Sequence, residues 1–370
     1  MSELFSPYEL GTLQLKNRIV IAPMCQYSAK DGNASDWHKV HLGHLLLSSA
    51  GLLTLEATAV ESVGRISPHD LGLWSDENEQ SLKRVLTEVR QYSSMPVAIQ
   101  LSHAGRKASS HVPWAGGQLI PVEQGGWTPL APSAVPHFPS EPAPAALDRK
   151  ALDRIRDAFA LAAQRAHRIG IDAIEMHAAH GYLLHQFLSP LSNLRTDEYG
   201  GSLSNRMRFP LEVFDAIRNA IPISMPVGVR ISCTDWVEGG WDIEQSIVFA
   251  DELRDRGCTF IHVSSGGLSP MQKIPLGPNY QVGMAESVRR ATGLPTVAVG
   301  LITEPQQAED IVASGQADMA ALARAILFNP RWPWHAAAAL GGQVEAPAPY
   351  WRSQPRGLSD LFGDIRFGQR

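Results

Sequence analysis

The sequence alternates short apolar runs with longer amphipathic segments, and this alternation constrains the fold more than any other feature. Helical periodicity appears near residues 39–50, 76–92, 148–169, 205–220, 242–256, 284–292 and 305–314, with a shorter stretch after Pro330. Eight apolar runs lie before or between these segments: Arg18–Ala22, Leu52–Glu56, Val97–Leu101, Ala173–His177, Val227–Ile231, Phe260–Ser264, Thr296–Gly300 and Met319–Arg324. Near-continuous apolar runs followed by helices are typical of parallel strands buried on both faces. Eight such units predict an α/β chain folded as a (β/α)8 TIM barrel.

An open, doubly wound sheet is the alternative architecture. Dinucleotide-binding sheets of that kind carry a Gly-x-Gly-x-x-Gly motif after a strand, and no candidate strand here is followed by one. The length of 370 residues fits a barrel with insertions. We therefore expect one barrel domain, residues 1–345, and a C-terminal tail, residues 346–370.

Two segments lie outside the eight-unit pattern. Residues 113–145, between the third strand and its helix, contain eight prolines and no regular period. A connection of this length is usually functional or disordered, so we expect either a lid or pocket wall at the C-terminal face of the barrel, or a plain surface excursion. The tail is aromatic and basic near Trp351 and Arg352, and it either wraps its own barrel or reaches a neighbouring subunit.

Composition narrows the classes of partner. The formal net charge is −5, with 32 Lys and Arg against 37 Asp and Glu and no basic block, which argues against nucleic acid or an anionic membrane. The three cysteines are widely spaced, so they predict a reducing compartment and no cysteine-ligated metal site. No secretory signal or membrane-spanning run is apparent. We expect a cytoplasmic protein that acts on small molecules.

The carboxyl ends of the candidate strands are unusually polar, which is where barrel enzymes keep their chemistry. His177 and His180 follow the fourth strand and are open to two interpretations. As metal ligands they would make a metal-dependent barrel hydrolase, although no third ligand is evident. As hydrogen-bond donors they would polarise one carbonyl or nitro oxygen, and the adjacent Tyr182 would suit a general acid. Cys25 also has two interpretations: it could be a nucleophile, or it could pack as a small apolar side chain.

A phosphate-binding signal follows the last two strands. Backbone amides of Gly300, Leu301 and Ile302, together with the Arg324 guanidinium after Ala323, would bind a dianion. Barrels often bind phosphate at this place. The pattern predicts a phosphorylated cofactor.

Several long motifs resemble the Old Yellow Enzyme family. They are Pro23-Met24-Cys25-Gln26-Tyr27, Glu56-Ala57-Thr58, the run from Gln100 to Lys107, the run from His177 to Leu183, and the run from Arg195 to Arg206. The resemblance covers residues 4–352, and Cys25 with Tyr27 is similar to the xenobiotic-reductase or thermophilic-like ene-reductase branch. It implies non-covalent FMN at the C-terminal mouth of a barrel and reduction of activated alkenes by NADPH or NADH. Within the last of these runs, Asp197–Arg206 contains Gly200-Gly201 and Asn205 before a helical pattern, so we interpret it as a turn and helix start and assign it no catalytic role.

The resemblance also implies roles for individual residues. His177 and His180 would hold the substrate oxygen, Tyr182 would supply the proton, and Tyr27 and Cys25 would contact the substrate. The FMN-binding set would be Ala22, Pro23, Met24, Cys25, Ala57, Gln100, Arg230, Gly300, Leu301, Ile302, Ala323 and Arg324. Many relatives have Gly where this chain has Ala323. Trp351 and Arg352 would reach the active site of a neighbouring subunit in a homodimer or higher homo-oligomer.

Overall fold

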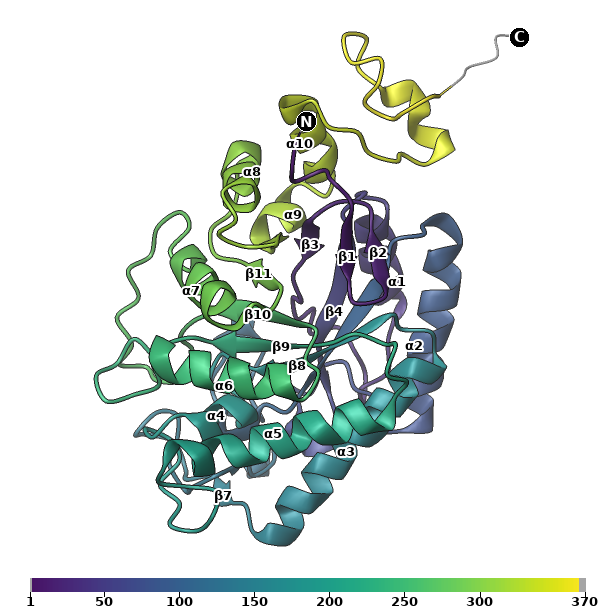
Figure 1. Ribbon diagram of the computed structural model, residues 1–370. Helices are drawn as coiled ribbons and strands as arrows, with labels where there is room; N and C mark the ends of the chain where they lie inside the picture. Colours follow the sequence, from purple (N-terminus) through teal and green to yellow (C-terminus); the bar gives the residue numbers. More distant parts are fainter. Residues whose placement is uncertain (1, 366–370) are drawn as a thin grey trace.

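Eight parallel strands close into a barrel in the computed structural model, which describes residues 2–365 (Figure 1). The strands follow one another around the barrel in chain order. They are β3 (Ile19–Ile21), β4 (Leu52–Ala59), β5 (Val97–Ser102), β8 (Ala173–Ala178), β9 (Val227–Ser232), β10 (Phe260–Ser264), β11 (Thr296–Ala298) and β12 (Met319–Leu322). The TIM barrel predicted from the sequence is confirmed.

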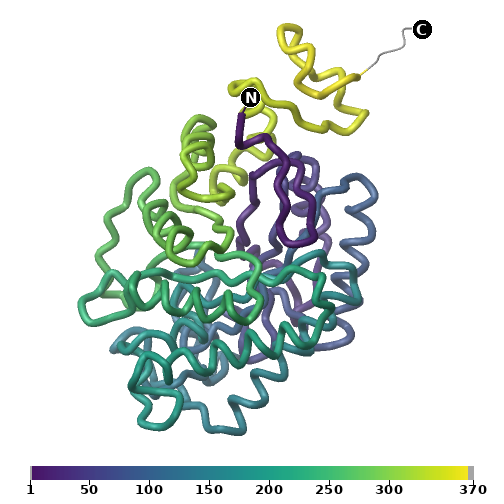
Figure 2. The backbone as a smooth tube through the Cα atoms, in the orientation of Figure 1, coloured from purple at the N-terminus to yellow at the C-terminus, as the bar shows by residue number. Residues whose placement is uncertain are grey.

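Helices cover the outside of the barrel (Figures 1 and 2). The longer ones are α1 (Asp36–Leu46), α2 (Asp76–Val89), α3 (Arg149–Arg168), α5 (Leu203–Ala220), α6 (Ile243–Asp255), α7 (Val282–Thr292), α8 (Pro305–Ala313) and α10 (Trp332–Leu340). Two short helices, α4 (Leu183–Leu188) and α9 (Arg324–Phe328), were not predicted because one or two turns are too short to show a period. The main apolar core lies between the strands and these helices.

The last two strands end earlier than predicted. At the end of β11, Gly300 and Leu301 have φ angles of +129° and +52°, which leave the extended region. At the end of β12, Ala323 is the N-cap of α9, so Arg324 begins a helix. The predicted phosphate-binding residues therefore lie on loops and a helix start, beyond the strands themselves.

The barrel interior is apolar near the N-terminal ends of the strands and polar near their C-terminal ends. A hairpin of β1 (Tyr8–Leu10) and β2 (Leu13–Leu15), also not predicted, closes the N-terminal end, where the Thr12 hydroxyl donates to the Ser224 carbonyl at 2.6 Å. Leu10 and Leu15 of the hairpin pack with inward-facing apolar residues from the strand starts. The opposite, C-terminal end is left to the polar side chains.

The proline-rich excursion lies over the C-terminal end. It contains two 3-10 turns, Pro113–Ala115 and Val122–Gln124, and the short strands β6 (Leu130–Ala131) and β7 (Ala145–Ala146). The Arg106 guanidinium donates to the carbonyls of Val135 and Leu268, at 3.3 and 2.7 Å, so it ties the excursion to the loop after β10. The Trp114 ring stands edge-on to Tyr27, with the ring centroids 5.7 Å apart.

The tail folds back near the N-terminus, beyond α10 (Figure 1). Phe362 packs against Trp334 of α10, with ring centroids 4.9 Å apart. The Trp351 indole donates to the Ala346 carbonyl at 2.9 Å, and Arg352 is exposed. Within residues 2–365, no contact joins either residue to the mouth of its own barrel. No helix in that range is both long and apolar enough to cross a bilayer.

Candidate active site

The alternation of side chains along the strands places the polar residues inside the barrel, towards its C-terminal end. On β8, Glu175 and His177 are two residues apart, so their side chains share the inner face. The ladder pairs Glu175 with Gln100 on β5, and it pairs His177 with Arg230 on β9. Arg230 in turn pairs with His262 on β10. The register of the four neighbouring strands β5, β8, β9 and β10 therefore brings these groups together.

His177 and His180 meet at the end of β8. Nε2 of His177 lies 3.4 Å from Nδ1 of His180, and the ring planes are nearly perpendicular. The turn after β8 makes this possible because His180 adopts a φ of +58° and Gly181 one of +73°. Burial lowers the pKa of both imidazoles well below the ordinary value, and the Arg230 cation adds to the effect. Both rings are therefore neutral at pH 7.

Tyr182 lies against this pair. Its ring is edge-on to His177, with centroids 5.0 Å apart. Burial raises the pKa of the phenol well above 10, so the hydroxyl keeps its proton at neutral pH. Lys107 holds the same turn, since its ammonium donates to the carbonyls of His180 and Gly267 at 2.9 and 3.1 Å and lies 5.1 Å from the Tyr182 ring centroid. Burial lowers the pKa of Lys107 to about 8.

A buried carboxylate, Glu175, organises the groups below the histidine pair. Its two oxygens accept from Nε2 of Gln100 at 2.6 Å and contact Nδ1 of His262 at 2.8 Å. Burial alone would raise the pKa of Glu175, but His262 and Arg230 outweigh burial and lower it. The Arg230 side chain is 8% exposed and its Nε has no hydrogen-bond partner. A buried cation with an unpaired donor points to a missing acceptor.

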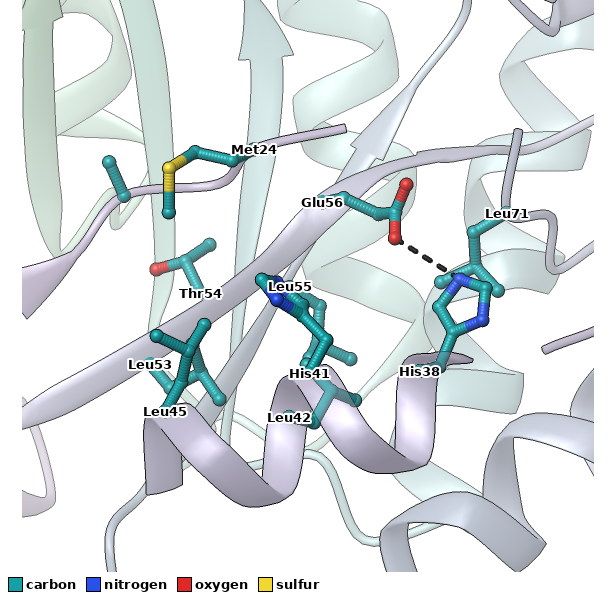
Figure 3. A pocket seen from close by; sticks show the side chains of 11 residues that line it. Met24, His38, His41, Leu42, Leu45, Leu53, Thr54, Leu55, Glu56 and Leu71 are labelled. Carbon is teal, nitrogen blue, oxygen red and sulfur yellow. Dashed lines mark ion pairs between the residues drawn. The ribbon is translucent and has the colours of Figure 1, made fainter. Parts of the chain in front are cut away.

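A second carboxylate, Glu56, supports the segment after β3 from behind. A β-bulge between Leu55 and Ala57 turns Glu56 outward to α1, where Figure 3 shows it pointing at His38. The His38 Nε2 lies 3.2 Å from one oxygen of Glu56, and the backbone N–H of Gln26 donates to the other at 2.8 Å. Glu56 thereby anchors the loop that carries Cys25 and Tyr27.

Cys25 and Tyr27 are half-buried. Burial is the main cause that raises the pKa of the Cys25 thiol and of the Tyr27 phenol. The nearby carboxylates of Asp70 and Glu56 raise both pKa values further. Cys25 is therefore a neutral thiol at pH 7. A neutral thiol is a poor nucleophile, so the geometry favours its use as part of the site wall.

A cavity of about 210 Å³ extends from His180 to the predicted phosphate site. Seven of the predicted site residues line it: His180, Arg230, Gly300, Leu301, Ile302, Ala323 and Arg324. In the described part of the chain, the N–H groups of Gly300, Leu301 and Ile302 donate to no other group. Free backbone donors beside an exposed guanidinium form a suitable site for a phosphate group.

The other predicted residues are distributed around this cavity. Gln100 and Ala57 are buried at paired positions on β5 and β4, inside the barrel. Ala22 and Met24 line a smaller cavity with residues of β4 and α1 (Figure 3). Pro23 is half-buried between them. Trp351 and Arg352 remain outside, in the tail.

Sequence reasoning missed several residues of the site. It assigned no role to Lys107, Glu175 or His262, nor to Ser264 and Gln281, which line the cavity. Ser264 had a usable signal because it is a polar residue at the end of a buried strand. The partners of Glu175 had none, since only the pairing and register of the strands bring β5, β8 and β10 together.

Across residues 2–365, no three or more His, Cys, Asp or Glu side chains are grouped so that they could hold a metal ion. His177 and His180 instead contact each other, and His180 also contacts Ser264. The metal-dependent hydrolase considered from the sequence lacks the further ligands that it requires.

A family profile described as "NADH:flavin oxidoreductase / NADH oxidase family" matches residues 3–342. The chain belongs to this family. It is an oxidoreductase with FMN as cofactor and a reduced nicotinamide as reductant, and it is consistent with the Old Yellow Enzyme resemblance seen in the sequence.

Relatives of known name agree with this assignment. The chain is 44% identical to an NADPH dehydrogenase of Geobacillus thermodenitrificans over 351 residues, which cover 94% of this chain and 98% of that protein. It is 43% identical to an NADPH dehydrogenase of Listeria innocua, with 95% and 99% covered. Among solved structures, morphinone reductase is 30% identical with a TM-score of 0.76, covering 94% of this chain and 92% of that one. A related structure is morphinone reductase in complex with tetrahydroNAD, with a TM-score of 0.75.

The residues present fit FMN. The cavity offers unpaired amides and Arg324 for a phosphate. The same cavity reaches the unpaired Nε of Arg230, a buried cation that suits a ring system which gains negative charge on reduction.

Proposed function

We propose that this oxidoreductase is an ene-reductase that reduces activated alkenes such as enones, enals and maleimides, and also accepts nitro compounds and quinones. Bound FMN would supply hydride chemistry, taking a hydride from NAD(P)H and passing it to the β-carbon of the alkene. The observation that carries the proposal is the pair of imidazole nitrogens, 3.4 Å apart, beside the protonated phenol of Tyr182.

His177 and His180 would bind the carbonyl or nitro oxygen of the substrate. Two N–H donors on one oxygen withdraw charge from the conjugated alkene, and they bind more strongly as the oxygen becomes negative. Such a contact lowers the barrier of the chemical step because it is strongest in the transition state. Neutral rings are required at rest, and the lowered pKa values of both histidines provide them.

Tyr182 would deliver the proton to the α-carbon from its phenolic oxygen. A phenol with a raised pKa keeps its proton until a strongly basic enolate is formed beside it. Tyr27 and Cys25 would orient the substrate from the segment after β3. Trp114, edge-on to Tyr27, would exclude water from that side.

The remaining site residues would hold FMN. We assign the phosphate to Gly300, Leu301, Ile302, Ala323 and Arg324. Gln100 would bind the pyrimidine edge and Arg230 the neighbouring part of the ring that gains negative charge. Ala22, Pro23, Met24, Cys25 and Ala57 would form the surrounding wall, and the Cys25 thiol would tune the reduction potential.

An anaerobic absorbance titration tests the proposal. Visible flavin bands should bleach with NADPH and return on addition of 2-cyclohexen-1-one. His177→Ala should retain the first change and slow the second strongly, because in the second step the imidazole pair would bind the oxygen on which negative charge develops. Bands that bleach but do not recover with any enone or maleimide would reject the ene-reductase assignment while leaving the family assignment intact.

A further inference from the structure

The ring of His180 faces a different partner at each nitrogen. Nδ1 faces Nε2 of His177 at 3.4 Å, and Nε2 faces the Ser264 hydroxyl at 2.7 Å. A neutral imidazole carries one proton, so one nitrogen donates and the other accepts. The choice decides whether His180 can donate into the space that it shares with His177.

The backbone fixes the proton of His177. Its Nδ1 accepts from the N–H of Ala179 at 3.3 Å, so the proton of the neutral ring is on Nε2. This N–H points towards Nδ1 of His180. The separation of 3.4 Å is longer than an ordinary N–H hydrogen bond, which suits two donors that flank a common acceptor better than a bond between the rings.

Gln281 directs the Ser264 hydroxyl. The Gln281 Nε2 donates to the Val299 carbonyl at 2.8 Å, so its Oε1 faces two serines. Ser265 donates to that oxygen at 2.7 Å, whereas Ser264 is 3.4 Å away. The Gln281 oxygen has a second lone pair, but its contact with Ser264 is long, whereas Nε2 of His180 lies 2.7 Å from the same hydroxyl. The shorter contact favours donation of the Ser264 proton to His180.

We infer that Ser264 is a positioning residue whose hydroxyl donates to Nε2 of His180 and thereby holds this ring as the Nδ1–H tautomer. The Nε2–H of His177 and the Nδ1–H of His180 then point at one position. That position accepts an oxygen with two free lone pairs and no proton to donate. The inference rests on the proposed function for its consequence, which is selection of carbonyl and nitro groups over hydroxyl groups.

The tautomer can be measured directly. Long-range proton–nitrogen NMR on the FMN-loaded protein with 15N-labelled histidine distinguishes a protonated from an unprotonated ring nitrogen. His180→Gln identifies the His180 signals. We expect Nδ1 to be protonated and Nε2 to be unprotonated in the wild type.

Substitutions then separate the hydroxyl from general packing. Ser264→Ala should shift His180 towards the Nε2–H tautomer and weaken binding of 2-cyclohexen-1-one to the oxidised protein about tenfold, the effect of one hydrogen bond. Ser264→Thr keeps a hydroxyl and should restore both. Ser232→Ala is the matched control, because this serine lies at the paired position on β9 and accepts from the His180 backbone N–H at 2.9 Å without contacting its ring. It should leave the tautomer unchanged.

The outcomes distinguish the two proposals. A wild-type His180 that is protonated at Nε2 overturns the inference, whatever the activity. An unchanged tautomer in a folded Ser264→Ala protein also overturns it, and if that variant does not fold, the wild-type and Ser264→Thr spectra decide. Failure of the wild type to reduce any activated alkene would reject the proposed function, and the NMR result would still decide the tautomer.

Discussion

Tyr182 shows how surroundings fit a single side chain to its chemistry. The phenol stays protonated and uncharged at neutral pH because burial raises its pKa. We expect Tyr182→Phe to slow reoxidation by 2-cyclohexen-1-one by about 100-fold or more, while reduction by NADPH keeps its rate. Anaerobic stopped-flow absorbance measures the two half-reactions separately. Tyr199→Phe, which removes a buried hydroxyl bound to Glu212, is the control. Equal slowing of both half-reactions would contradict the role of proton donor.

Glu175 places a negative charge inside the barrel, next to Gln100 and Arg230. Removing that charge should stabilise a reduced, more negative cofactor. We expect Glu175→Gln to raise the midpoint potential of bound FMN by about 30 mV, a tenfold change in a two-electron equilibrium. Spectroscopic titration against a reference dye measures it. Asp318→Asn, which alters a carboxylate bound to Arg289 at the opposite end of the barrel, should leave the potential unchanged. A lower potential in Glu175→Gln would refute the electrostatic argument.

At the scale of elements, the turn between β8 and α4 is built on a close approach of two loops. Gly181 has a φ of +73°, and a Cβ there would lie 2.2 Å from the Gly267 carbonyl oxygen. Gly170 has a φ of +80° but open space around it. Gly170→Ala should cost about 1 kcal/mol of unfolding free energy, and Gly181→Ala about 2 kcal/mol more because the backbone must also move. Urea denaturation measures both. Equal costs would show that the contact with Gly267 is unimportant.

The Arg195–Arg206 run contains the turn and the N-cap that precede α5. We interpreted it as a turn and helix start, and the structure agrees in outline. Ser202 is the N-cap of α5, since its hydroxyl accepts from the Asn205 N–H at 3.3 Å. The Asn205 amide donates to the Gly200 carbonyl at 3.0 Å and closes the preceding turn. Both residues are good capping types, so only the backbone decides between them.

At the scale of the whole molecule, buried histidines make stability depend on pH. The pKa of His177 and His180 lies well below 6.5 in the folded state, so the unfolded chain takes up protons that the folded protein does not. Unfolding free energy should fall as pH decreases from 7 to 5, by up to about 1.4 kcal/mol per pH unit for each of these two rings. His41 and His137, with pKa values lowered to about 4 mainly by burial, act in the same direction.

Asp70 opposes this trend, because burial raises its pKa to about 7 and the folded protein takes up one proton first. The histidines outnumber it, so the net slope keeps its sign. Urea denaturation of the FMN-free protein at pH 7, 6 and 5 tests the prediction, and His177→Gln should reduce the slope by about one proton. Stability that rises on acidification would show that carboxyl groups with raised pKa values, such as Asp70, outweigh the histidines.

The tail gives a prediction about assembly. We propose that the protein forms a homo-oligomer in which Trp351 and Arg352 reach the active site of a neighbour. Arg352→Ala should then raise the KM for bulky enones, whereas Arg356→Ala, at another exposed arginine four residues on, should not. Steady-state kinetics and sedimentation together test this. A monomer in solution, or an unchanged KM in Arg352→Ala, would count against it.

The sequence by itself determined the barrel, its strand order and the candidate chemistry at the strand ends. Period and burial are local properties, so eight apolar runs separated by helices were sufficient for the fold. The motifs around His177, Tyr182 and Gly300 could be found in the same way, because each is contiguous in the chain.

Only the tertiary structure decided which groups act together. Glu175 meets Gln100 and His262 through the pairing of strands across 75 and 87 residues of sequence, and Ser264 reaches His180 across 84. The bulge that turns Glu56 towards His38, and the hairpin that closes the barrel floor, likewise have no local signature in the pattern of apolar residues. Hydrogen bonds and pKa values depend on distances between atoms, and those distances are fixed only when strands distant in sequence become neighbours.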